Sequence, residues 1–102
     1  MSHWRRKGYV VIRNQKSGLV LDASEYQIKL QHFTGYDVQL WKLEPTVDGK
    51  FFIVMSAAPG NFAVDIRRQN FCAGTEIIAY PRHGGANQVF QLQYQQVLAN
   101  AE

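Results

Sequence analysis

The apolar residues of this chain fall in short runs that are separated by turn-forming residues. β-Branched and aromatic types dominate the runs, which is typical of strands, and glycines punctuate the gaps. The pattern predicts strands over residues 9–13, 19–22, 28–33, 38–43, 51–56, 62–66, 75–80 and 88–94. Helices are expected to be scarce, so the predicted fold class is all-β.

The two halves of the chain repeat each other about a central turn. Asp48-Gly49 is a tight-turn dipeptide, because glycine readily adopts positive φ, and it lies between the fourth and fifth predicted strands. The aligned segments are residues 10–22 with 52–65, 30–33 with 77–80, and 39–43 with 88–92. Glycine, aspartate, an aromatic residue and Gln-x-aromatic follow in one order in both halves, which favours true repetition over chance alternation. We therefore predict one domain over residues 1–102, with repeat one over about 8–49 and repeat two over about 50–94.

Composition supports a single globular domain. Hydrophobic residues make up 46% of the 102, enough for a core without metal or disulfide, and the charged residues, 19%, are scattered. The net charge of +3 comes largely from Arg5-Arg6-Lys7 and Arg67-Arg68, runs too short for a basic stripe. Nucleic acid is therefore not an expected partner.

The single cysteine, Cys72, excludes an intrachain disulfide, so a reducing compartment fits best. Beside Phe71 it is expected to be a small buried apolar residue. The apolar run at residues 9–12 is shorter than a signal-peptide core, and no run reaches the ~18 residues that cross a bilayer. We expect a soluble cytoplasmic protein with no membrane insertion.

Each half ends on glutamine, one further residue and an aromatic residue, as Gln39-Leu40-Trp41 and Gln88-Val89-Phe90. With the preceding Ile-x-Asn, Ser-Gly and Leu-Asp elements, this repeat resembles that of the ricin B-type lectin family, whose repeats each close on Gln-x-Trp. The resemblance extends over roughly residues 8–94. It implies a β-trefoil, in which three repeats surround a pseudo-threefold axis, and sugar binding without catalysis or cofactors.

The chain holds two repeats where the resemblance implies three. About three such units are needed to close a shared core, so an open side must be covered. A homo-oligomer is the expected remedy: three chains supply six repeats, and a symmetric dimer can pair its open edges. The alternative is a rearranged small barrel in a monomer.

In the family, an aspartate after the second strand, an aromatic platform and polar residues before Gln-x-Trp hold the sugar. Repeat two supplies Asp65, Tyr80, His83, Asn87 and Gln88. The resemblance assigns hydroxyl binding to the Asp65 carboxylate and to Asn87, and the platform to Tyr80. Gln88 is expected to brace Asp65 or the loop, and His83 to close over the ligand.

Repeat one is a poorer match to the family. Its ligand-binding candidates are Asp22, Gln31, Phe33 and Gln39. Val38 stands where repeat two has Asn87, although Asp37 beside it is a possible substitute. Repeat two departs from the family once as well, because Ile78 replaces the polar residue that Gln31 represents. Neither pocket is complete by the family pattern.

Structural roles compete with sugar contact at these positions. Loop aspartates cap turns as often as they bind ligands, so both interpretations of Asp22 and Asp65 stay open. Gln39 and Gln88 are more readily explained as partners of buried backbone groups in their loops. The aromatic residue that ends each motif is expected in the core.

The predicted function is a non-catalytic module that recognises glycans through shallow pockets. The three histidines and the cysteine lack the spacing of a zinc site, and no nucleophile–base pair or phosphate-binding loop is present in the sequence. The alternative is a protein-interaction module on a lectin scaffold that has lost sugar binding. A further rival, anion or nucleic-acid binding through residues 4–7, rests on Trp4 beside three cations, which equally suits a solvated terminus.

Overall fold

The structure is a computed structural model that describes residues 8–92, so the rival anion site at residues 4–7 and the end of the last predicted strand, residues 93–94, lie outside the described residues. The strands are β1 (Val20–Asp22), β2 (Lys29–Gln31), β3 (Trp41–Pro45), β4 (Phe52–Ser56), β5 (Phe62–Ile66) and β6 (Ile77–Pro81). One-turn 3-10 helices are η2 (Asp37–Gln39), η3 (Arg67–Gln69) and η4 (Ala86–Gln88). The described residues form no α-helix, and none of their helices is long and apolar enough to span a membrane. The predicted all-β class is confirmed.

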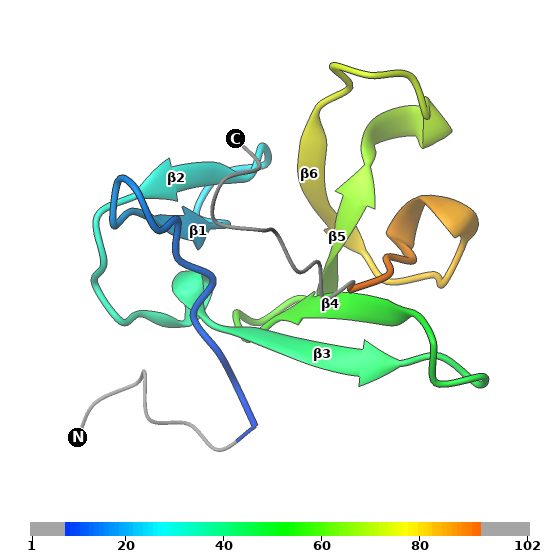
Figure 1. The fold of residues 1–102 in the computed structure, drawn as a ribbon, viewed down its shortest axis with the longest axis horizontal. Coiled ribbons are helices and arrows are strands. Elements are labelled where there is room, and N and C mark those ends of the chain that lie inside the picture. Colours follow the sequence, from blue (N-terminus) through cyan, green and yellow to red (C-terminus); the bar gives the residue numbers. More distant parts are fainter. Residues whose placement is uncertain (1–7, 93–102) are drawn as a thin grey trace, which may run out of the picture.

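Two antiparallel sheets organise the fold (Figure 1). β1 and β2 form a separate hairpin, and β3, β4, β5 and β6 form a four-stranded sheet in chain order. β4 and β5 share a single residue pair, so β5 and β6 turn away from β3 and β4 as a second hairpin. The loop of the first hairpin lies against β6, because Ala79 N donates to Tyr26 O at 2.9 Å and Ile28 N donates to Ile77 O at 3.0 Å.

The same backbone pairings recur in both halves of the chain. The equivalent pairs are Val10–Trp41 with Phe52–Phe90, Arg13–Val20 with Met55–Ala63, and Asp22–Lys29 with Asp65–Ile78. Each half is therefore an entry segment, a hairpin and a closing segment that pairs back to the entry. A trefoil has three such units, and the described residues form two of them.

The structure departs from the predicted strands at the start of repeat one and at the end of both repeats. Residues 9–13 form isolated bridges at Val10 and Arg13 instead of a strand. The predicted strand at residues 38–43 begins only at Trp41, and the one at residues 88–94 shows a single bridge at Phe90 within the described residues. At the repeat ends the cause is the 3-10 turn before each aromatic residue, since residues in such a turn bond locally and cannot join a ladder.

The core gathers around β3, β4 and β5. Its buried apolar side chains are Val20, Leu40, Trp41, Ile53, Val54, Met55, Ala63 and Ile78. Trp41 is fully buried, as predicted, and its indole N–H donates to Leu21 O at 3.3 Å, whereas Phe90 is half-buried. The prediction that Cys72 is buried is wrong: it is exposed, because the β5–β6 connection that carries it extends into solvent.

One edge of this partial trefoil has no neighbour among the described residues. β6 is covered by the loop of residues 26–28 and has Ile78 buried, whereas β2, its counterpart in repeat one, is exposed at every residue. Leu30 on β2 keeps 45% of its surface exposed. Within residues 8–92 the strands do not close into a barrel, so the alternative of a rearranged small barrel does not hold for them.

Candidate functional site

The motif glutamine of repeat two, Gln88, is fully buried and organises the loop around it. Its Oε1 accepts hydrogen bonds from the backbone N–H groups of His83 and Gly84, at 2.9 and 3.1 Å. Its Nε2 donates to Pro81 O at 3.0 Å and to Asp65 Oδ2 at 2.8 Å. One amide thus uses all of its hydrogen-bonding capacity, and it fixes the loop and the carboxylate relative to each other.

Gln39 repeats this arrangement in repeat one. Its Oε1 accepts from the backbone N–H groups of Thr34 and Gly35, at 2.7 and 3.2 Å. Its Nε2 donates to His32 O at 2.8 Å and to Asp22 Oδ2 at 2.9 Å. Both glutamines are fully buried, so their contacts fit the role of a loop brace and not direct contact with a sugar.

The strand register corrects the sequence alignment of the two repeats. The pairs that close the hairpins are Asp22–Lys29 and Asp65–Ile78. The step from aspartate to partner is seven residues in repeat one and thirteen in repeat two, and the motif glutamine follows ten residues after each partner. The counterpart of Tyr80 is therefore Gln31, whereas matching residues 30–33 to 77–80 had set Phe33 against it. Repeat two has six additional residues between the aspartate and the second hairpin strand. The match was wrong because it did not place all six of them before that strand.

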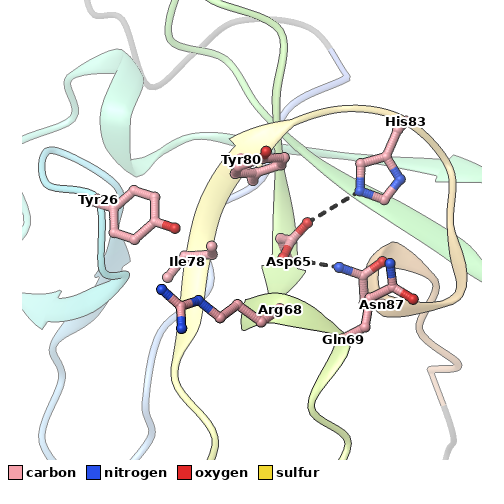
Figure 2. Close-up of a pocket in the computed structure, with 8 residues that line it drawn as sticks. All are labelled: Tyr26, Asp65, Arg68, Gln69, Ile78, Tyr80, His83 and Asn87. Atoms are coloured by element: carbon pink, nitrogen blue, oxygen red, sulfur yellow. Dashed lines mark hydrogen bonds and ion pairs between the residues drawn. The ribbon is translucent and has the colours of Figure 1, made fainter.

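A pocket of about 410 Å³ opens beside Asp65 in repeat two (Figure 2). Its lining residues are Tyr26, Asp65, Arg68, Gln69, Ile78, Tyr80, His83 and Asn87. The structure thus places four of the five residues predicted for repeat two around one cavity, and the fifth, Gln88, braces Asp65. Across residues 8–92, no three His, Cys, Asp or Glu side chains gather closely enough to hold a metal ion.

Asp65 supplies the negative charge of the pocket, although only 2% of its surface is exposed. Asn87 Nδ2 donates to its Oδ1 at 3.1 Å, and Gln88 Nε2 donates to its Oδ2 at 2.8 Å. Both donors are neutral amides, so they stabilise the carboxylate without cancelling its charge. A carboxylate has about four acceptor positions, so Asp65 retains capacity for donors on a ligand.

Asn87 carries an unpaired acceptor. The residue is 3% exposed, and its Nδ2 donates to Asp65 Oδ1 and to Ile66 O, at 3.1 and 3.2 Å. Because both of these neighbours are acceptors, the amide nitrogen must face them, which fixes the orientation of the side chain. Asn87 Oδ1 is then buried with no hydrogen-bond partner among the described residues.

Tyr80 and His83 form the rim of the pocket. Tyr80 is 44% exposed, and its ring meets the His83 ring edge-on, with centroids 6.1 Å apart. His83 Nδ1 accepts from Gly85 N at 2.9 Å, so a neutral imidazole carries its proton on Nε2, which lies 3.5 Å from Asp65 Oδ2. A Cβ at Gly85 would lie 2.8 Å from His83 Cε1, so glycine there lets the loop fold this closely.

Tyr26, Arg68 and Gln69 line the pocket without having been predicted. Tyr26 belongs to the loop of the first hairpin, and its carbonyl holds that loop against Ala79. A comparison of the two repeats carries no signal for Tyr26, because only the docking of one hairpin on the other brings it to the site. Arg68 and Gln69 lie in the longer β5–β6 connection, for which repeat one has no equivalent segment.

The corresponding place in repeat one has different chemistry. Asp22 Oδ1 accepts from Ser24 N at 2.7 Å in a local turn. Burial raises the pKa of Asp22, but the hydrogen bonds from Ser24 and Gln39 together outweigh it and hold the pKa below its ordinary value. The counterparts of Ile78, Tyr80, His83 and Asn87 are Lys29, Gln31, Thr34 and Val38. Phe33 lies elsewhere, with the Arg13 guanidinium over its ring at 5.4 Å.

Two β units, each closed by a loop around a buried glutamine, define this chain as an incomplete β-trefoil of the lectin type. The family described as ricin-type β-trefoil lectin domain-like matches residues 1–80. This is most of the chain, so the chain belongs to that family, and the resemblance seen in the sequence is confirmed. The ricin B-type lectin domain is a non-catalytic carbohydrate-binding family.

Solved structures show the same fold. The designed threefold-symmetric protein ThreeFoil superposes with a TM-score of 0.75 at 22% identity, over 85% of this chain and 65% of its own. A mosquitocidal holotoxin superposes with a TM-score of 0.74 at 20% identity, over 88% of this chain and 12% of its own. This chain therefore spans less than two thirds of either protein. No curated protein matches its sequence.

Proposed function

We propose that this chain is a carbohydrate-binding module and that its sugar site is the Asp65 pocket of repeat two. Asn87 Oδ1 carries the proposal, because it is a buried acceptor without a partner in residues 8–92, on a residue that lines the pocket. Buried polar atoms are nearly always paired, so an unpaired acceptor beside a cavity points to a ligand that donates. Two acceptors side by side, Asp65 and Asn87, suit neighbouring hydroxyl groups of a sugar ring.

In the proposed complex, one hydroxyl donates to Asp65 and its neighbour donates to Asn87 Oδ1. The bond to the charged acceptor is the stronger of the two. Tyr80 offers an exposed aromatic face to the C–H side of the sugar ring. His83 donates from Nε2 to a sugar oxygen at the rim, and Gln88 acts only by holding Asp65 in place.

Tyr80→Ala tests the site with little disturbance of the fold, because the ring lies on the rim. Tyr36→Ala is the matched control, a loop tyrosine of repeat one that is 62% exposed and outside the pocket. A glycan array identifies a sugar that binds, and calorimetric titration with that sugar measures its affinity. We expect Tyr80→Ala to lose about tenfold or more and Tyr36→Ala to keep wild-type affinity. Wild-type affinity in folded Tyr80→Ala would reject this pocket.

A protein-interaction module on the same scaffold is the second candidate function, and repeat one favours it. There Gln31 and Val38 take the places of the ring and the amide of the pocket. Apolar side chains are exposed on the same repeat, with Leu30 at 45% and Phe33 at 38%. Absence of glycan binding by the folded wild-type chain, with capture of a protein on this face, would favour that function over sugar binding.

We further propose that another copy of the chain covers the open side. Within one chain, the loop of residues 26–28 covers β6, and in an assembly the β5–β6 loop of one copy would cover β2 of the next in the same way. Phe71 on that loop is 60% exposed and supplies apolar surface for the contact. Three two-repeat chains supply six units, enough for two complete trefoils, whereas a symmetric dimer would pair its two open edges. Light scattering on the 102-residue chain measures the mass, and a value of one chain would contradict the proposal.

A further inference from the structure

An arginine side chain that has no partner in the described part of the chain lines the same pocket. Arg68 lies on η3, and its side chain extends away from Asn87 toward Ile78 and Tyr26 (Figure 2). Within residues 8–92 it forms no hydrogen bond or ion pair, and Asp65 is held by two amides instead. A cation and an anion therefore line one cavity without neutralising each other.

The neighbouring arginines differ from Arg68 in this respect. Arg67 forms an ion pair with Glu76, and Arg82 forms one with Glu44 at 3.1 Å. Neither Arg67 nor Arg82 lines the pocket beside Asp65. Of these three arginines, the one that lines the cavity, Arg68, forms no ion pair with an acidic side chain in residues 8–92.

The backbone that presents Arg68 is in an uncommon conformation. The φ angle is 55° at Arg68 and 57° at Gln69, in the left-handed region that Cβ disfavours. Such strain persists only where the surroundings hold it, and it gathers at ligand-binding sites. Both residues line the pocket, so the strained turn contributes two polar side chains to the cavity.

We infer that this pocket takes an acidic sugar, whose carboxylate or sulfate group binds Arg68 while neighbouring hydroxyls bind Asp65 and Asn87. The inference rests on the proposed sugar-binding function of the pocket. Guanidinium forms paired hydrogen bonds with the oxygens of either anion. A neutral sugar would leave Arg68 unused, and a polyanion would be repelled by Asp65. A polyhydroxyl ring that carries one acidic group complements both charges.

Sugars that differ in a single group provide the test. Galactose, galacturonic acid and galactose 6-sulfate form one set, and glucose with glucuronic acid forms another; each is titrated calorimetrically into the 102-residue chain at low salt. We expect an acidic member to bind about tenfold tighter than its neutral counterpart. Arg68→Gln should reverse this preference, because Asp65 then faces the acidic group alone.

Two further variants separate charge in the pocket from charge on the molecule. Arg82→Gln removes the same charge outside the pocket and should leave the preference intact. Arg68→Lys keeps the charge but loses the fork geometry, so it should retain part of the preference. Circular dichroism and thermal melting establish that each variant is folded.

The outcomes distinguish this inference from the proposed function. Equal binding of acidic and neutral sugars by the wild-type chain, or an undiminished preference in Arg68→Gln, would overturn the inference and leave sugar binding intact. No binding of any sugar, on the array or in solution, would contradict the proposed function itself. Preference for galacturonic acid alone identifies the planar carboxylate as the group bound, and equal preference for the sulfate identifies the anionic charge; either result supports the inference.

Discussion

Gln88 joins a loop, a strand end and a carboxylate through one side chain. Gln88→Leu keeps a similar size but leaves two backbone N–H groups, Pro81 O and Asp65 without this partner. Each unpaired buried polar group costs about 1–3 kcal/mol, so the free energy of unfolding should fall by about 3 kcal/mol or more. Urea denaturation measures the change. Gln15→Leu, at an exposed turn position in repeat one, is the matched control and should stay within about 0.5 kcal/mol of wild type.

Asp22 makes the free energy of unfolding depend on pH in the acid range. Its pKa lies below the ordinary value of 3.8, because hydrogen bonds from Ser24 and Gln39 outweigh burial, which raises it. A lowered pKa in the folded chain means that the ionised carboxylate favours folding. Its contribution is complete above the unfolded pKa and is lost as pH falls through the folded value. Stability should therefore decline below about pH 4, and Asp22→Asn should reduce that decline.

Denaturation of the wild type and of Asp22→Asn between about pH 5 and pH 2 measures this decline. The free energy of unfolding of Asp22→Asn will still fall somewhat with falling pH, because the backbone N–H of Lys50 and the Thr46 hydroxyl also lower the pKa of Asp48. At neutral pH the variant should be less stable than the wild type. The introduced amide nitrogen then faces Gln39 Nε2 or Ser24 N, and two donors cannot form a hydrogen bond with each other. If Asp22→Asn lost as much free energy of unfolding on acidification as the wild type, this role for Asp22 would be contradicted.

At the scale of elements, strands set by apolar alternation could be predicted and the turns between them could not. β5 begins and ends where the pattern placed it, and β4 begins one residue later than predicted. Residues 38–40 also alternate, yet they form a 3-10 turn that buries Gln39. Reading alternation assumes that polar residues face water, and a glutamine that braces a loop breaks that assumption.

The same contrast holds for the pocket. Asp65, Tyr80 and Asn87 could be predicted because their order before the Gln-x-aromatic motif of repeat two resembles the sugar-binding pattern of the family. Tyr26 and Arg68 could not, because one arrives by the docking of two hairpins and the other by a lengthened connection without a copy in the chain. Equal spacing from hairpin strand to motif glutamine was a usable signal for the register, and the six additional residues before the strand obscured it.

The docked hairpin loop gives a prediction of its own. Tyr26 is 55% exposed and brings a second aromatic ring to a pocket that otherwise belongs to repeat two. Tyr26→Ala should weaken sugar binding about threefold to tenfold and leave the melting temperature unchanged, since the backbone bond to Ala79 remains. Tyr36→Ala is again the control, a tyrosine that is 62% exposed and outside the pocket. Calorimetric titration of both variants decides whether one hairpin contributes to the site of the other.

At the scale of the whole molecule, the proposed assembly depends on the edge of β2, which no other part of residues 8–92 covers. Leu30 is the counterpart of Ala79, which is half-buried under the loop of residues 26–28, yet Leu30 is 45% exposed. If another copy covers this edge, Leu30→Lys buries a charge at the contact and should shift the chain to monomers in sedimentation equilibrium. Val47→Lys, at a fully exposed turn position, is the matched control and should leave the mass unchanged.

Sugar binding should respond differently from assembly. Every residue that lines the pocket comes from a single chain in this structure, so a monomeric Leu30→Lys protein should bind free sugar with wild-type affinity per site. On a surface coated with glycan it should bind more weakly than the assembled wild type, because several linked sites raise the apparent affinity without any new contact. A loss of affinity for free sugar would instead mean that the pocket needs the neighbouring copy. An unchanged mass would mean that β2 is not the edge through which the chains associate.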